Sequence, residues 1–246
     1  MRLINVRTLI LEEFYADIPA YAILSHCWSH DEVTFKEWQD NFVSAQRKKG
    51  YGKIQQACAE AMVLGYGYLW CDTNCIDKTS SAELTEAINS MFDWYALSDA
   101  CLAYLDDVPS QSPRSAFCGS RWFTRGWTLQ ELLAPPDVRF YDKNWAFLGL
   151  RSAMTDQVTR ATGIDATFLE PTSPAIAREK LDGASIAMRM SWLSTRETTR
   201  AEDLAYCMLG IFGINMPLLY GEGIKAFQRL QEEIIRATND MTLFCW

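Results

Sequence analysis

Short apolar runs alternate with helical patterns along the first part of the chain. The runs lie at residues 21–24, 66–70, 101–105 and 138–141. Between the first two runs, apolar residues recur three and four positions apart at Ile54, Ala57, Cys58 and Ala61, and Gly65 is placed to end that helix. This alternation is typical of parallel βα units and predicts an α/β sheet flanked by helices.

Two more helices are predicted before residue 150. Ser80 and Glu83 stand at the spacing of a capping box, and an apolar face follows them as far as Tyr95. A third helix is expected from about Thr124 to Leu133, ended by two prolines.

The predicted third helix carries its candidate site residues and its leucines on opposite faces. Trp127 and Glu131 are four residues apart and share one face, whereas Leu129 and Leu133 lie on the opposite side. The leucines are therefore expected to contact the core. Trp127 and Glu131 are left to line a site, although a solvated glutamate beside a half-buried tryptophan fits the spacing too.

The last third of the chain has helical patterns only. A helix is predicted at 154–162, then a loop at 171–174, an apolar helix opened by a second capping-box spacing at 199–212, and an amphipathic helix after Gly223. We expect a single domain over residues 1–246, in which an α/β core (1–150) carries a mostly helical extension (151–246) packed on it.

Charge and hydropathy exclude two kinds of partner. Lysine and arginine number 23 against 31 aspartates and glutamates, a net charge of −8, which argues against nucleic-acid binding. The longest apolar stretch, 204–220, is interrupted by Asn215 and Pro217 and is too short for a membrane span. The amino terminus lacks an apolar stretch of signal-peptide length.

The eight cysteines suit a reducing compartment, so we expect a cytoplasmic protein. Cys71 and Cys75 are the closely spaced pair, and a Cys-x3-Cys without a second pair is a weak metal signal. Only His26 and His30 could complete such a site. No metal site is therefore expected.

Polar residues follow each of the four predicted strands. They are Ser25 and His26, Cys71 and Asp72, Asp106 and Asp107, and Asp142. Because ligands bind at the carboxyl ends of strands in open parallel sheets, these positions are the first candidates for a site. Polar residues also collect at strand ends for no functional reason, since loops are exposed.

Several longer motifs, in order, resemble the heterokaryon incompatibility (HET) domain of filamentous fungi. They are YAILSHCW (21–28), DTNCIDK (72–78), AINSMF (87–92), SRWFTRGWTLQELL (120–133), RMSW (189–192), TTRAED (198–203) and MPLLYGEG (216–223). The resemblance covers nearly the whole chain. It implies an effector of nonself recognition that triggers regulated cell death, activated by a receptor or an incompatible partner protein.

HET domains are in turn similar to Toll/interleukin-1 receptor (TIR) domains. This implies a TIR-like (flavodoxin-like) parallel sheet and homotypic self-association. In enzymatic TIR domains a Trp-x3-Glu helix carries the glutamate that cleaves NAD, and the match here is Trp127 with Glu131. The resemblance makes Glu131 the catalytic carboxylate and NAD or NADP the substrate, with no further cofactor. The Arg-Gly of the TIR loop is replaced by residues 77–80.

The chemistry is compatible with one glutamate. Breaking the nicotinamide–ribose bond passes through an oxocarbenium-like state that a carboxylate stabilises, and nicotinamide leaves as a neutral ring. Trp127 or Trp28 could stack on a base, and Arg125, Lys78 or Arg121 could pair with the pyrophosphate. The expected substrate-binding residues are Ser25, His26, Trp28, Asp72, Lys78, Arg125 and Trp127.

Three alternatives stay open at this level. The domain could be a non-catalytic module that signals death by homotypic contacts. A metal-dependent phosphoesterase could use Asp72, Asp77, Asp106 and Asp107, since clustered carboxylates suit Mg²⁺. A thiol nucleophile, Cys27 or Cys75 with His26, is disfavoured because adjacent residues of a strand point to opposite faces.

Overall fold

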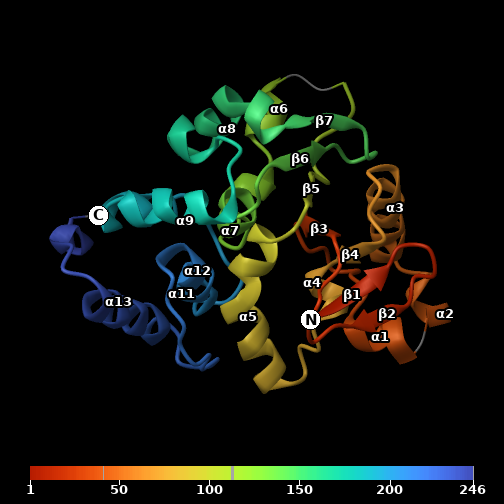
Figure 1. Cartoon of the computed structure of the whole chain (residues 1–246), viewed down its shortest axis with the longest axis horizontal. Coiled ribbons are helices and arrows are strands. Elements are labelled where there is room, and N and C mark those ends of the chain that lie inside the picture. Colours follow the sequence, from red (N-terminus) through yellow and green to blue (C-terminus); the bar gives the residue numbers. More distant parts are fainter. Residues whose placement is uncertain (41, 112–113, 246) are drawn as a thin grey trace.

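The computed structural model, which describes residues 1–40, 42–111 and 114–245, has a seven-stranded sheet at its centre (Figure 1). The spatial order is β2-β1-β4-β3-β5-β6-β7. The strands are β1 (Arg2–Asn5), β2 (Leu11–Glu13), β3 (Tyr21–His26), β4 (Tyr68–Trp70), β5 (Ala100–Tyr104), β6 (Val138–Tyr141) and β7 (Phe147–Leu150). β3, β4, β5 and β6 are the four predicted strands, and they are confirmed.

The four central strands are parallel, and both edges are antiparallel. β3 pairs with β4 and β5, and β5 pairs with β6, all in parallel. β1 and β2 extend one edge and β7 extends the other. Numbered by their own order in the chain, the parallel strands lie 2-1-3-4 across the sheet. All six residues of β3 are buried, as expected for a central strand covered on both faces.

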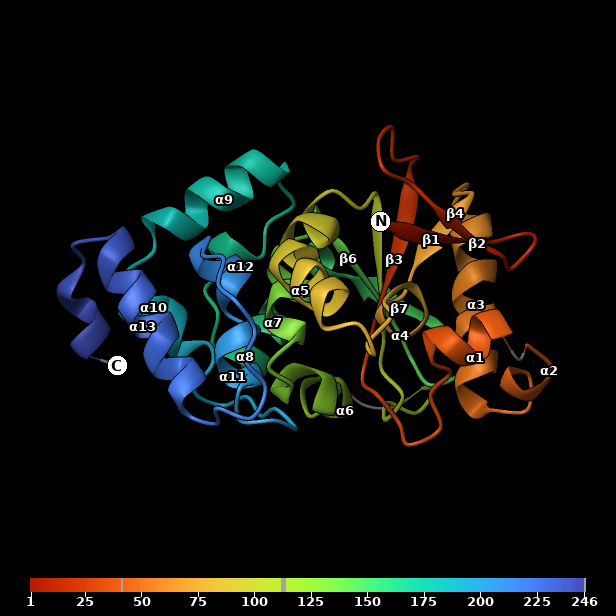
Figure 2. The ribbon, with the colours of Figure 1, turned by 90° about the horizontal axis from the view of Figure 1, so that it is seen from below.

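Helices cover both faces of the sheet. α1 (Phe35–Asp40), α2 (Phe42–Ala45) and α3 (Lys49–Val63) lie on one side, and α5 (Ser81–Ala96) and α7 (Thr128–Leu133) lie on the other (Figure 2). The short α4 (Asp72–Cys75) follows β4, and α6 (Arg114–Cys118) precedes the 3₁₀ helix η1 (Arg121–Thr124). The arrangement is the three-layer α/β fold that the alternation predicted.

The predicted ends of α3 and α5 are largely confirmed. Gly65 follows α3 with a φ of +92°, a conformation that favours glycine. The Ser80 hydroxyl accepts a hydrogen bond from the backbone N–H of Glu83 at 3.3 Å. The other arm of the capping box differs, because the Glu83 carboxylate accepts from the backbone N–H of Asp77 at 2.7 Å. The loop before α5 is thereby tied to its first turn.

The third predicted helix is shorter than expected. It begins at Thr128, because Arg125 is extended and forms an isolated β-bridge with Glu197. The backbone N–H of Gly126 donates to the carbonyl of Glu197 at 2.9 Å. A contact with a distant segment therefore takes the backbone groups that a longer helix would need.

The residues after 150 are mostly helical, as predicted, and those from 174 onward lie beyond α5 and α7 from the sheet (Figures 1 and 2). The elements are η2 (Arg151–Ala153), α8 (Thr155–Thr162), η3 (Ala166–Phe168), α9 (Pro174–Gly183), α10 (Ile186–Ser191), α11 (Asp203–Tyr206), α12 (Leu209–Phe212), α13 (Lys225–Ala237) and η4 (Met241–Phe244). Gly210 of α12 packs so closely on α5 that a Cβ there would lie 2.2 Å from the Cβ of Phe92.

The prediction of one apolar helix over 199–212 is wrong in detail. Two short helices, α11 and α12, stand in its place, and no side chain caps the first. The Glu202 carboxylate instead accepts from the backbone N–H groups of Gly221 and Gly223, at 2.8 and 3.0 Å. The second capping box is thus replaced by a link to the loop before α13. Among the helices described, none combines the length and apolar character of a membrane span.

Candidate functional site

A cavity of about 380 Å³ lies at the carboxyl ends of β3 and β4, beneath α5 and α7. Seven of the eight candidate residues line it: His26, Trp28, Asp72, Lys78, Arg125, Trp127 and Glu131. The eighth, Ser25, lies behind the wall and contacts Glu131. The structure therefore brings together residues that are up to 106 positions apart.

Glu131 is a buried carboxyl at the wall of the cavity. Its exposed fraction is 7%. The Ser25 hydroxyl donates to its Oε2, and the indole Nε1 of Trp122 donates to the Ser25 oxygen at 2.8 Å. Burial raises the pKa of Glu131 to about 8, while the Ser25 hydrogen bond and the charge of Arg125 lower it. A solvated glutamate is therefore wrong here, and the side chain holds a proton at neutral pH.

A cation and an indole stand together at the same cavity. The Lys78 ammonium lies 3.5 Å from the ring centroid of Trp28 and 3.2 Å from Oδ2 of Asp72. Trp28 is 44% exposed, so one large aromatic surface remains open to solvent. The three side chains supply a flat face and paired charges, the groups that bind a base or a phosphate.

The helical extension supplies part of the cavity wall, and no pattern in the sequence had pointed to this role. Thr199, Arg200, Asp203 and Tyr220 all line the cavity. The Arg200 guanidinium lies 4.6 Å from the Tyr220 ring centroid, and the Tyr220 hydroxyl donates to Asp203 Oδ1 at 2.9 Å. Arg125 and Arg200 form no ion pair with any described carboxylate. Their charges are available to an anionic ligand.

Arg196 holds the segment that carries Arg125, and no sequence signal marked it. Its guanidinium donates to the carbonyl of Arg125 at 2.8 Å and to Oγ1 of Thr128 at 2.9 Å. Burial lowers the pKa of Arg196 to about 10. The extension therefore fixes the backbone at the start of α7 through a buried cation.

Tyr95 of α5 also lines the cavity, and it was not among the predicted site residues. Its hydroxyl donates to the carbonyl of Leu24 at 3.1 Å, and burial raises its pKa far above the usual value. The phenol therefore stays protonated beside Glu131. In the sequence, Tyr95 is marked only by its position on the apolar face of the predicted helix that is now α5.

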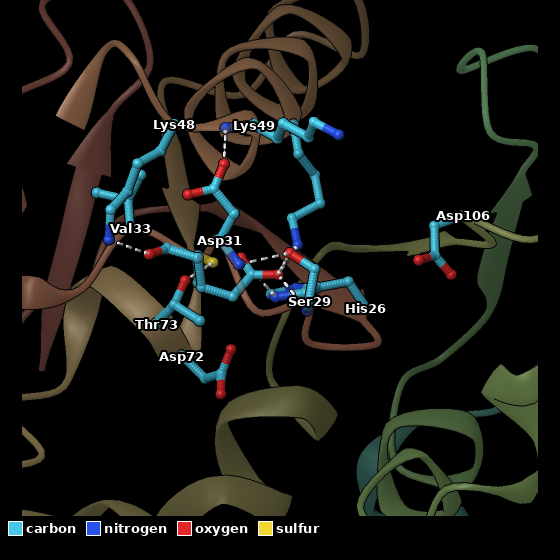
Figure 3. A network of polar contacts seen from close by, with 12 residues as sticks. His26, Ser29, Asp31, Val33, Lys48, Lys49, Asp72, Thr73 and Asp106 are labelled. Carbon is cyan, nitrogen blue, oxygen red and sulfur yellow. Dashed lines mark hydrogen bonds and ion pairs between the residues drawn. The ribbon is translucent and has the colours of Figure 1, made fainter.

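The four aspartates proposed for a phosphoesterase do not gather. Within the described part of the chain they form no metal-ligating group. Arg121 pairs with Asp106 at 2.7 Å and does not line the cavity, and Asp106 lies apart from Asp72 (Figure 3). Asp77 accepts from Thr79 instead. The clustering on which this alternative depended is wrong, and Arg121 stays outside the lining of the cavity.

The proposed thiol nucleophiles are unsuited to that role. All eight cysteines are free, and Cys27 and Cys75 are buried. Burial raises the pKa of Cys27 to about 12 and that of Cys75 well above its usual value. Both therefore remain thiols at neutral pH, whereas a thiolate is the nucleophile in cysteine catalysis.

His26 has a different environment. Desolvation, together with the charges of Lys53, Lys78 and Arg125, lowers its pKa well below the usual value, so the ring is neutral. One ligand atom from each of His26, Cys71 and Asp72 lies within 4.8 Å of the other two. Spacing along the chain did not predict this group, because β3 supplies the histidine, whereas Cys71 precedes α4 and Asp72 is its first residue.

These features define a doubly wound α/β domain with a buried carboxyl in a cavity at the carboxyl ends of its strands. Residues 21–117 match the family described as Heterokaryon incompatibility protein (HET). The chain is also 44% identical over 228 residues to the Vegetative incompatibility protein HET-E-1 of Podospora anserina. The chain therefore carries a HET domain.

That alignment covers 88% of this chain but 16% of the Podospora protein, so the chain spans a small part of its relative's length. No solved structure matches the chain significantly.

Proposed function

We propose that the domain hydrolyses the nicotinamide–ribose bond of NAD or NADP as an effector of cell death in fungal nonself recognition. The biological part rests on the relationship to a vegetative incompatibility protein. The chemical part rests on one observation above all: a buried glutamate, Glu131, faces a cavity lined by aromatic rings and unpaired arginines.

The environment of Glu131 suits a cationic substrate. When no positive charge lies beside it in the cavity, this carboxyl is protonated at neutral pH, because its pKa is raised to about 8. The nicotinamide ring of NAD carries a positive charge, and an adjacent positive charge favours the carboxylate. The substrate thus generates the ionised form, which then stabilises the oxocarbenium-like ribose as the bond breaks.

The reaction balances with this one group. The carbon–nitrogen bond to nicotinamide breaks, and nicotinamide leaves neutral with the bonding electron pair. Water adds to the ribose carbon, and its proton passes to the Glu131 carboxylate and then to solvent. The products are nicotinamide and ADP-ribose, or its phosphate from NADP.

The rest of the cavity matches the other parts of a dinucleotide. Arg125, Arg200 and Lys78 carry positive charge for the pyrophosphate, although the whole chain has a net charge of −8. Trp28 and Trp127 offer rings on which a base can stack.

The fold supports the same proposal from a different direction. The parallel strand order 2-1-3-4 matches the first four strands of the flavodoxin-like order 2-1-3-4-5, the class to which the TIR resemblance assigns the domain. In that class ligands bind outside the carboxyl ends of the strands, which is where Glu131 meets the cavity.

The direct test is release of nicotinamide from NAD and NADP by the purified chain, followed by chromatography. A concentration series with and without enforced dimerisation is included, because we expect activity to require self-association. Glu131→Gln should lower kcat by at least about a hundredfold, the size of a removed electrostatic contact. Glu179→Gln, the same charge change at an exposed position of α9, is the matched control. Turnover by Glu131→Gln at the wild-type rate would refute the assignment.

The same pair of variants separates catalysis from a non-catalytic signalling role in cells. Expression of the wild-type chain and of Glu179→Gln in a fungal host should kill, and Glu131→Gln should not. Killing by Glu131→Gln at the wild-type level, with a folded protein, would favour homotypic signalling over hydrolysis.

A further inference from the structure

One buried side chain lacks the partners that its burial demands. The His26 side chain is 1% exposed, yet neither ring nitrogen has a hydrogen-bond partner among the described residues. A buried imidazole without partners loses its bonds to water and gains nothing in return. A bound ligand would supply the partner that this imidazole lacks.

Two other donors converge on this ring. Cys71 is the first residue after β4 and Asp72 is the next, and one atom of each lies within 4.8 Å of the other and of a His26 nitrogen. A neutral imidazole, a thiolate and a carboxylate are the three kinds of side-chain ligand that Zn²⁺ takes in proteins. His26 and Asp72 also line the cavity, so a fourth position is open to water or a small ligand.

We propose that His26, Cys71 and Asp72 bind a Zn²⁺ ion at the wall of the cavity.

The surroundings supply the supporting contacts of a zinc site. Oε2 of Glu32 is buried, has no hydrogen-bond partner and lies 3.8 Å from Nε2 of His26. Histidines bound to zinc commonly donate their second ring N–H to a carboxylate, which fixes the ring orientation. Thr73 supplies a hydroxyl 3.1 Å from the Cys71 sulfur. Three ligand side chains and an orienting carboxylate are therefore in place around the proposed ion.

The charges are compatible with a divalent cation. A Cys71 thiolate and the Asp72 carboxylate together neutralise Zn²⁺. Three cations act on His26, and two of them have acidic partners, since Lys53 pairs with Glu32 at 2.6 Å and Lys78 with Asp72 at 3.2 Å. The third, Arg125, forms no ion pair with a described carboxylate and faces the cavity. Figure 3 shows Asp72 on the segment beneath His26, whereas Asp106 stands on a separate segment. Binding releases the thiol proton of Cys71.

The test measures metal binding directly and does not depend on NAD cleavage. The reduced, chelator-treated chain is titrated with Zn²⁺ by calorimetry and with Co²⁺ by absorption, where a thiolate ligand gives a charge-transfer band. The wild type should bind one ion. Cys71→Ser and Asp72→Asn should each weaken binding at least about tenfold, and Cys71→Ser should abolish the charge-transfer band.

Cys75→Ser is the matched control, because Cys75 is an equally buried thiol four residues away that accepts from the Cys71 N–H. This variant should bind as the wild type does. Absence of binding by the wild type would overturn the proposal, as would undiminished binding by Cys71→Ser or its loss in Cys75→Ser. Circular dichroism of each variant confirms that the fold is intact before the titration is compared.

Discussion

The hydroxyl of Ser25, in β3, donates a hydrogen bond to the carboxyl group of Glu131, in α7, 106 residues further along the chain. The Trp122 indole N–H donates to the same hydroxyl oxygen, so the Ser25 hydroxyl accepts one hydrogen bond and donates its own proton to Glu131. The core of the domain therefore fixes how the buried carboxyl is presented to the cavity. Several measurable consequences arise from this arrangement.

The first consequence is a pH dependence of NAD cleavage. The active form of Glu131 is the carboxylate, and its pKa in the unliganded domain is raised to about 8. Since kcat/KM reports ionisations of the free enzyme, it should rise about tenfold per pH unit below about pH 8 and level off above it. Steady-state rates across this range at subsaturating NAD measure the profile. A profile that is flat from about pH 6 to 9 would contradict it.

The second consequence concerns Ser25→Ala. Its hydroxyl lowers the pKa of Glu131, so the variant should shift the kcat/KM profile to higher pH and reduce the rate at neutral pH. The substitution also leaves the Trp122 N–H without its acceptor, at a cost of about 1–3 kcal/mol in the free energy of unfolding. Ser98→Ala is the control, because Ser98 is a buried serine that bonds to the Tyr95 carbonyl. Its midpoint pH should stay at the wild-type value.

The third consequence is a pH-dependent stability difference between Glu131→Gln and the wild type. The pKa of Glu131 rises from 4.5 to about 8 on folding. Between these values the folded state holds a proton that the unfolded state has lost, so the wild type loses stability as pH rises and levels off above about 8. Glutamine does not titrate. The variant should therefore match the wild type near pH 4.5 and exceed it increasingly up to about pH 8.

Thermal unfolding in a pH series measures this difference. For a chain of this size, 1 kcal/mol corresponds to roughly 2–4 °C in Tm, so a gap of several degrees is expected at alkaline pH. Glu179→Gln, on the surface, should show no gap that grows with pH. A gap that narrows towards alkaline pH would contradict the raised pKa.

Local patterns predicted most of the sheet and its helices, because periodicity and caps act within a few residues. Ser80 caps α5 as its spacing indicated. The edge strands β1, β2 and β7 were not predicted, although β4 and β6 are just as short. The edge strands are less buried than β4 and β6, so their apolar pattern is weaker.

Site residues could be predicted where a single helix or a single strand end carries them. They could not be predicted where segments that are distant in the chain come together. Helical spacing marked Glu131 as a side chain on the face away from the leucines. The same spacing could not show that this face is covered, because Arg200 and Tyr220 come from the extension. His26, Cys71 and Asp72 become neighbours only through the parallel pairing of β3 with β4.

The last prediction tests whether the extension is an integral part of the domain. Gly210 of α12 faces Phe92 of α5, and a Cβ at that position would lie 2.2 Å from the Phe92 Cβ. Gly210→Ala should therefore push α12 from α5 and lower the free energy of unfolding by about 1–3 kcal/mol, the usual cost of overpacking. Because α5 supplies Ile88 and Met91 to the cavity wall, KM for NAD should rise as well.

Gly52→Ala is the matched control, since Gly52 lies within α3 and nothing lies within 4 Å of an added Cβ. That substitution should stabilise the chain by about 0.5–1 kcal/mol, because alanine favours the helix over glycine. Thermal unfolding and NAD kinetics on both variants give the comparison. If Gly210→Ala unfolds only residues beyond 150 and leaves the sheet and NAD cleavage intact, the extension is a separable unit and its place in the cavity wall has no functional role.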